Sequence, residues 1–145
     1  METIWQTHRI KHEKINREEE MFKISHPSDV VAFLHEELKD LDREHFVLLT
    51  LNTKNFVNSF SIIHIGSVNA SIVDISLVLK TAILNNATSL IVAHNHPTGF
   101  SKPSPQDIEI TERLNKACEI VHLTLLDHIV VGDGNYTSLK TEGFF

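Results

Sequence analysis

The most chemically suggestive part of the chain lies between residues 94 and 107. Segment 94–97 is His-Asn-His-Pro, and after six further residues segment 104–107 is Ser-Pro-Gln-Asp. Histidines two residues apart share one face of a strand, and the proline keeps the residue before it extended. Two imidazoles and one carboxylate suit a divalent metal, and three protein ligands leave a fourth position for water, as in catalytic zinc sites. The spacing therefore predicts a metal site formed by His94, His96 and Asp107.

The second half of this pattern is also a helix-capping sequence. Ser104 would be the N-cap, Pro105 the first helical residue, and Asp107 would bond back to the cap. Asp107 precedes Ile110 by three residues and so aligns with the buried stripe of the predicted helix, where a carboxylate without a partner would be costly. Capping by itself does not explain why two histidines precede this sequence. Two roles therefore stay open for Ser104, as a helix cap and as a residue of the site.

Composition limits the other possibilities. The chain has 145 residues, 41% hydrophobic and 22% charged, which is typical of one globular domain. One cysteine, Cys118, excludes an internal disulfide and a zinc site built from several thiolates, and its place on an apolar stripe predicts a core residue. The net charge of −6 does not favour a nucleic acid. Without a secretory signal or a long apolar run, we expect a cytoplasmic protein that does not enter membranes.

The hydrophobic pattern predicts a single α/β domain, in which helices flank a mixed sheet, over residues 25–145. Residues 1–24 carry five basic and five acidic side chains and are predicted to form a flexible arm or an edge element. The first helix should follow an N-cap at Ser28. The expected helices are 29–41, 75–86 and 105–121, and the expected strands are 45–52, 56–66, 89–94, 123–132 and 136–139.

The pattern His-x-His-Pro, six residues, Ser-x-x-Asp resembles the metal-binding signature of the JAMM/MPN (JAB-domain) metallopeptidases. The local sequences HNHPTG and PSPQD, and the segment 125–139, LLDHIVVGDGNYTSL, are similar to the RadC branch of that family. The resemblance covers about residues 28–139 and implies a JAMM/MPN, cytidine-deaminase-like architecture. Full-length RadC proteins have a helix-hairpin-helix region in front, for which this chain leaves no room. Thr98 stands where serine is more usual.

The resemblance also implies roles for individual residues. His94, His96 and Asp107 correspond to zinc ligands. A glutamate from an early strand is the general base, and Glu44 matches its position, with Glu36 or Glu37 as alternatives. Ser104 is assigned to stabilise the oxyanion. The implied reaction is hydrolysis of a peptide or isopeptide bond in a peptide or protein substrate by a metal-activated water.

Several alternatives stay open at this point. A RadC-related chain could be an accessory module in DNA repair with a structural or regulatory metal, although the charge does not favour direct DNA binding. Two histidines and a carboxylate also suit non-haem iron. MPN domains often pair, so a homodimer is one option. Asp127 and His128 could support the site or be an ordinary pair on a strand, and the loop from Gly99 to Lys102 is predicted to be mobile beside the substrate approach.

Overall fold

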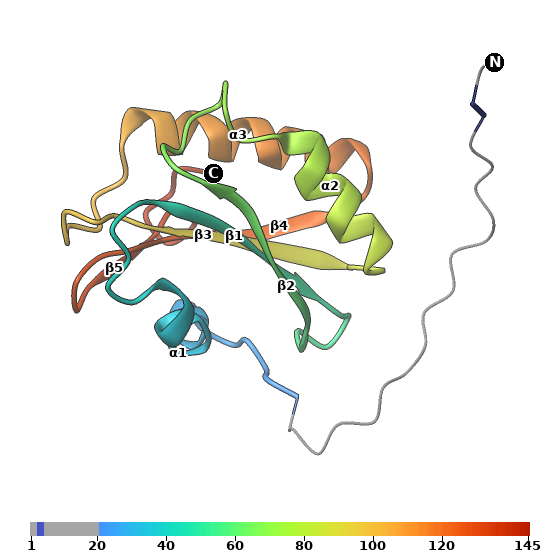
Figure 1. Cartoon of the computed structure of the whole chain (residues 1–145). Coiled ribbons are helices and arrows are strands. Elements are labelled where there is room, and N and C mark those ends of the chain that lie inside the picture. The colour runs from blue at the N-terminus through green and yellow to red at the C-terminus, as the bar shows by residue number, and fades with distance from the viewer. Residues whose placement is uncertain (1–2, 5–20) are drawn as a thin grey trace.

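The computed structural model of the chain describes residues 3–4 and 21–145. These residues form one mixed five-stranded sheet with the strand order β2-β1-β3-β4-β5, flanked by three helices (Figure 1). The elements are α1 (Pro27–Leu38), β1 (His45–Leu51), β2 (Val57–Ile65), α2 (Ile75–Leu84), β3 (Ser89–Asn95), α3 (Pro105–Ile120), β4 (Thr124–Val131) and β5 (Tyr136–Ser138). Among these five strands, β3 and β4 pair in parallel and the other neighbours pair antiparallel. The predicted α/β class with a mixed sheet is confirmed.

Helices cover both faces of the sheet, with α1 on one face and α2 and α3 on the other (Figure 1). Because successive strand residues point to opposite faces, the central strands are apolar on both sides. In β3, Val92 packs in the core on the α3 side, whereas Ala93 packs in the core on the α1 side. His94 follows this alternation and therefore faces α3.

The predicted element boundaries agree closely with the structure except at α1. This helix begins at Pro27 with His26 as its N-cap, so the N-cap predicted at Ser28 is wrong, and the helix ends at Leu38 rather than at residue 41. The reason is that proline suits the first helical position, and Asp29 accepts the backbone N–H groups of Ser25 and His26 at 2.7 and 2.8 Å. No helix formed by the described residues is long and apolar enough to cross a membrane.

Most of the predicted arm, residues 1–24, lies outside the described residues. Its last residues lie against the β1–β2 hairpin. Lys23 forms an isolated bridge with Phe56, and the N–H of Ile24 donates to the carbonyl of Asn55 at 2.9 Å. Ile24 is buried in the core on the α1 side. The sheet therefore continues for a short distance beyond β2 at this corner.

Candidate metal centre

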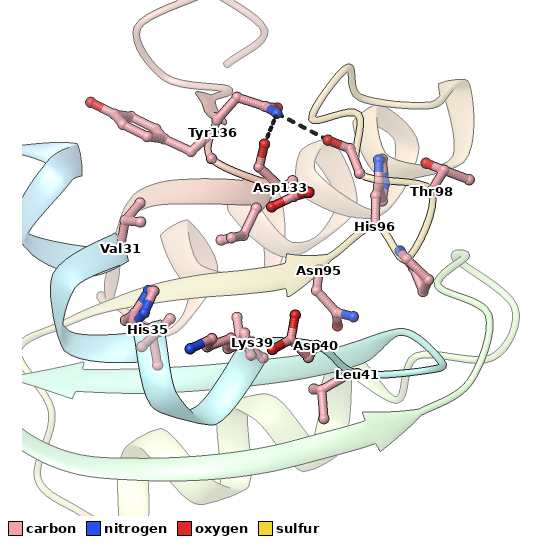
Figure 2. Close-up of a pocket in the computed structure, with 18 residues that line it drawn as sticks. Val31, His35, Lys39, Asp40, Leu41, Asn95, His96, Thr98, Asp133 and Tyr136 are labelled. Atoms are coloured by element: carbon pink, nitrogen blue, oxygen red, sulfur yellow. Dashed lines mark hydrogen bonds between the residues drawn. The ribbon is translucent and has the colours of Figure 1, made fainter.

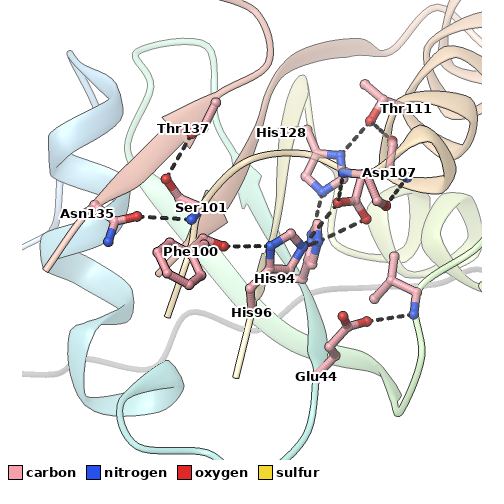
Figure 3. A network of polar contacts seen from close by, with 12 residues as sticks. Glu44, His94, His96, Phe100, Ser101, Asp107, Thr111, His128, Asn135 and Thr137 are labelled. Carbon is pink, nitrogen blue, oxygen red and sulfur yellow. Dashed lines mark hydrogen bonds and ion pairs between the residues drawn. The ribbon is translucent and has the colours of Figure 1, made fainter. Parts of the chain in front are cut away.

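The structure brings His94, His96 and Asp107 together at the end of β3 and the start of α3 (Figure 3). One ligand atom from each residue lies within 4.8 Å of the other two. The Nε2 atoms of His94 and His96 are 3.1 Å from each other, and each is 3.1 Å from an oxygen of Asp107. Nitrogen and oxygen atoms in this arrangement could hold a metal ion.

Position in the sheet orients the two imidazoles differently. His94 is fully buried, is paired in register with Phe46 of β1, and stacks on the Phe46 ring at a centroid distance of 6.2 Å. His96 lies just past the last residue of β3. Its backbone N–H donates to the carbonyl of Val131 at 2.9 Å, and its Nδ1 lies 2.8 Å from the carbonyl oxygen of Phe100. Both Nε2 atoms consequently face the same point.

Asp107 has two functions in the structure. It belongs to a capping box at the start of α3, in which Asp107 Oδ2 accepts the N–H of Ser104 at 2.8 Å and Ser104 Oγ accepts the N–H of Asp107 at 3.1 Å. The same carboxylate is 2% exposed and faces both imidazoles. Capping and a place in the metal cluster are therefore compatible, because Oδ1 faces His94 while Oδ2 faces both His96 and Ser104.

The hydrogen-bond chemistry of the cluster is compatible with a cation at its centre. A carbonyl oxygen only accepts, so His96 Nδ1 carries the proton that is donated to Phe100, and a neutral His96 ring then has a lone pair on Nε2. Burial by itself would raise the pKa of Asp107, but the adjacent imidazoles of His94 and His96 hold it well below its usual range. The hydrogen bond to Asp107 raises the pKa of His96. A proton or a metal ion can supply the positive charge between these atoms.

Sequence reasoning left the roles of Asp127 and His128 open, and the structure separates them. His128 on β4 is fully buried, and its Nε2 lies 2.8 Å from His94 Nδ1. Burial lowers the pKa of His128 well below its usual value. Asp127 instead accepts the Ser138 hydroxyl at 2.6 Å and the Lys140 N–H at 3.1 Å, and so connects β4 to β5 and the turn after it. Burial raises the pKa of Asp127.

Thr111 is a residue of the site that sequence reasoning missed. Its hydroxyl donates to the carbonyl of Asp107 at 2.6 Å, and the same oxygen lies 2.5 Å from His128 Nδ1. Thr111 follows Asp107 by four residues, so it lies on the same face of α3, one turn further on. That spacing is the only signal in the sequence that could have identified it.

Glu44 lies immediately before β1, beside the imidazole pair (Figure 3). Its Oε2 accepts the N–H of Val68 at 2.8 Å, and its backbone carbonyl accepts the N–H of Gly66 at 2.8 Å. The charge of Glu44 is one of the smaller causes that raise the pKa of His96. Glu44 is half-buried, whereas Glu36 and Glu37, the two alternatives, are exposed on α1. Of the three glutamates, Glu44 is the one whose charge acts on a residue of the cluster, His96.

A cavity of about 500 Å³ borders the cluster on the His96 side (Figure 2). It lies between the end of α1, the loop after β3 and the turn between β4 and β5. Its lining combines apolar side chains with Asn95, Asp133 and Tyr136. The volume is within the range of small-molecule sites, and His96 is the cluster residue that lines the cavity.

The loop after β3 is fastened to the β4–β5 turn by several hydrogen bonds. The carbonyl of Gly99 accepts from the backbone N–H of Asp133 at 2.9 Å and from Nδ2 of Asn135 at 3.0 Å, and Oδ1 of Asn135 accepts the N–H of Ser101 at 3.0 Å. A Cβ atom on Gly132 would come within 2.4 Å of the Gly99 oxygen. The loop predicted to be mobile therefore has a close-packed base, and Phe100 lies exposed at its tip.

Known proteins are similar to the part of this chain that forms the sheet and the helices. A family model described as the RadC-like JAB domain matches residues 24–144. A UPF0758 protein of Shouchella clausii is 47% identical over 134 residues, which cover 91% of this chain and 58% of the relative. For a UPF0758 protein of Desulforamulus reducens the identity is 49% over 117 residues, covering 81% of this chain and 52% of the relative.

A UPF0758 protein of Methanosarcina mazei is 42% identical over 127 residues, which cover 88% of this chain and 56% of the relative. The chain thus spans about half the length of the curated relatives it matches. The matched segment contains the whole sheet, the capped α3 and the cluster of two imidazoles and a carboxylate. On these grounds the chain belongs to the RadC-like JAB domain family.

Proposed function

We propose that this domain is a zinc-dependent hydrolase that cleaves a peptide or isopeptide bond with a metal-activated water. One observation carries the proposal: Nε2 of His94, Nε2 of His96 and the Asp107 carboxylate meet at one point with ligand atoms within 4.8 Å. Zinc binds imidazole nitrogen and carboxylate oxygen, and catalytic zinc sites use three protein ligands and one open position. The three residues present fit that requirement. Bound zinc supplies a water whose pKa is lowered to about 7.

In this proposal Glu44 moves the proton. Its Oε2 accepts the Val68 N–H, so Oε1 is the oxygen that we assign to accept a proton from the attacking water. The water oxygen bonds to the carbonyl carbon of the substrate, and the C–N bond then breaks. Glu44 passes the proton to the departing amine nitrogen, which leaves the carboxylate ready for another cycle.

Ser104 is the residue that we assign to the developing oxyanion. Its Oγ accepts the Asp107 N–H in the capping box, and an oxygen that accepts there can still donate its own hydroxyl proton elsewhere. Removing one oxyanion donor in a hydrolase costs about 10²- to 10³-fold in kcat. The N-cap position therefore suits Ser104 for both tasks that the sequence left open.

The test is hydrolysis of peptide and lysine-isopeptide substrates by the zinc-loaded protein. Glu44→Gln should keep its zinc and lose about 10²- to 10⁴-fold in rate, because the amide cannot accept the proton. Glu36→Gln and Glu37→Gln, on the exposed surface of α1, are matched controls that should hydrolyse normally. A Glu44→Gln variant as fast as the wild type would contradict the assignment of the base. Metal analysis distinguishes zinc from iron, which also accepts this ligand set.

An accessory role in DNA repair, with a structural or regulatory metal, makes a different prediction. Such a module would bind duplex DNA with an affinity that falls steeply as salt increases. The net charge of −6 does not favour this role. Titration of the metal-loaded protein with duplex DNA at two salt concentrations, alongside the hydrolysis assay, distinguishes the two functions.

A further inference from the structure

We propose that Thr111 and His128 are positioning residues that hold His94 in the tautomer with its proton on Nδ1, so that Nε2 keeps its lone pair for a metal. We refer to Thr111 and His128 together as the relay. The inference rests on the proposed metal site, but it concerns the position of a proton in the metal-free protein. It can therefore be tested apart from metal binding and hydrolysis.

The first contact of the relay is with the backbone carbonyl of Asp107. The Thr111 hydroxyl lies 2.6 Å from the Asp107 carbonyl, which can only accept, so the single hydroxyl proton is used there. The same oxygen lies 2.5 Å from Nδ1 of His128. Since Thr111 has no second proton to donate, it must accept at this contact. His128 therefore carries a proton on Nδ1.

The contact between His128 and His94 then determines which ring nitrogen of His94 carries the proton. His128 is fully buried, which favours the neutral ring with one N–H, and that N–H is already on Nδ1. Its Nε2 then has a lone pair, 2.8 Å from Nδ1 of His94. His94 Nδ1 must donate to it. A neutral His94 consequently has its own lone pair on Nε2, the atom that faces His96 and Asp107.

The opposite direction of the relay would be unfavourable. If Thr111 donated to His128, the Thr111 and Asp107 oxygens would face each other at 2.6 Å without a proton between them. His128 would then donate from Nε2 to His94, and the His94 proton would move to Nε2, inside the cluster. A ligand nitrogen that carries a proton cannot bind a metal, so reversal would weaken metal binding.

Packing keeps the two rings in place. His128 on β4 is paired in register with Val92, two residues before His94 on β3, so the rings are diagonal neighbours on the α3 side of the sheet. Phe46 contacts both, with centroid distances of 6.2 Å to His94 and 5.6 Å to His128. The relay thus connects the main chain of one candidate ligand, Asp107, to the ring of another, His94.

The direct experiment is long-range ¹H–¹⁵N NMR of the histidine rings in the metal-free wild-type protein, at a pH where both rings are neutral. We expect the Nδ1–H tautomer for His94 and for His128. The Nε2–H tautomer on His94 would overturn the relay. This measurement needs no substitution, so it does not depend on how well a variant folds.

A pair of variants tests the consequence for metal affinity, measured by competition with a zinc chelator. Thr111→Val keeps the side-chain shape but lacks the hydroxyl, and we expect it to bind zinc about 10- to 100-fold more weakly, as is typical when such supporting partners are lost. Thr111→Ser keeps the hydroxyl and should bind zinc nearly as well as the wild type. Equal zinc affinity in the two variants would overturn the proposal.

His128 offers a second, independent pair. His128→Gln can still place an acceptor near His94 Nδ1, whereas His128→Leu cannot. The glutamine variant should therefore bind zinc more tightly than the leucine variant. Equal affinity would again count against the relay. The proposed function fails in a different way: the wild type would show the expected tautomers but bind no zinc.

Discussion

The side-chain oxygen of Asn95 accepts a hydrogen bond from the backbone N–H of His45 at 2.7 Å. The Nδ2 group of the same amide donates to the carbonyl of Arg43 at 3.0 Å. Arg43 and His45 are the residues on either side of Glu44. Asn95, which lies between the two candidate ligand histidines, therefore holds the backbone that carries the candidate base, Glu44. The end of β3 thus positions both the candidate metal ligands and the candidate base.

Substitution of Asn95 should consequently separate zinc binding from hydrolysis. In Asn95→Ala both hydrogen bonds are lost, so the backbone on either side of Glu44 loses this support, while the three candidate ligands remain. We expect zinc content to stay near wild type and the hydrolysis rate to fall by about 10²-fold, as for a misplacement of about 1 Å. Asn52→Ala, at the other end of β1, removes an amide that likewise makes two hydrogen bonds to the backbone, and it should leave the rate unchanged. Equal rates in the two variants would contradict this role of Asn95.

Ser104 allows its two roles to be tested separately. Ser104→Ala should lose about 1 kcal/mol of unfolding free energy through the helix cap, whereas Ser104→Gly should lose only a few tenths. Both variants lack the hydroxyl, so both should hydrolyse slowly. Ser104→Thr keeps hydroxyl and cap and is the matched control. Denaturant unfolding and initial rates would be measured on all three, and a fast Ser104→Gly variant would show that the hydroxyl is not used.

Removal of zinc should lower the thermal stability of the protein. Zinc at about a thousand times its Kd would add about 4 kcal/mol to the free energy of unfolding if it binds only the folded state. Thermal unfolding with and without a chelator measures this difference. His96→Ala should unfold at the same temperature in both conditions, because one of the three ligand atoms is missing. A wild type that does not respond to the chelator would speak against a zinc site.

Cys118 gives a prediction for alkaline pH. Burial raises the pKa of the Cys118 thiol from 9.0 to about 11. Above pH 9 the unfolded chain loses this proton while the folded chain retains it, so the contribution to stability is complete below pH 9 and is lost as pH rises toward 11. The loss is about 1.4 kcal/mol per pH unit.

Cys118→Ala is the control, because every other group titrates in both proteins. The stability difference between wild type and Cys118→Ala should shrink between pH 8 and pH 11 in denaturant unfolding. A constant difference would show that the thiol ionises at its ordinary pKa when buried.

The sequence could predict the parts of this molecule that depend on local patterns. Alternating and helical hydrophobicity located the sheet and its helices, and the spacing from His94 to Asp107 identified the cluster because its ligands come from one strand end and the helix that follows. The start of α1 was misplaced, because a capping serine competes with a proline that suits the first helical position.

The partners of the site residues depend on strand pairing instead. His94 and His128 are 34 residues apart, and Asn95 and His45 are 50 apart. Their contacts exist only because β3 pairs with β4 on one side and with β1 on the other. No local pattern carries that register, so the relay and the role of Asn95 could be recognised only in three dimensions.

The double use of Asp107 links a helix end to the buried cluster. Its Oδ2 accepts the Ser104 N–H and also faces His96. Metal binding would restrain this carboxylate, and the Ser104 amide should then exchange its hydrogen with solvent more slowly. Amide exchange at this one position would thus report occupancy of the centre without the use of any substrate.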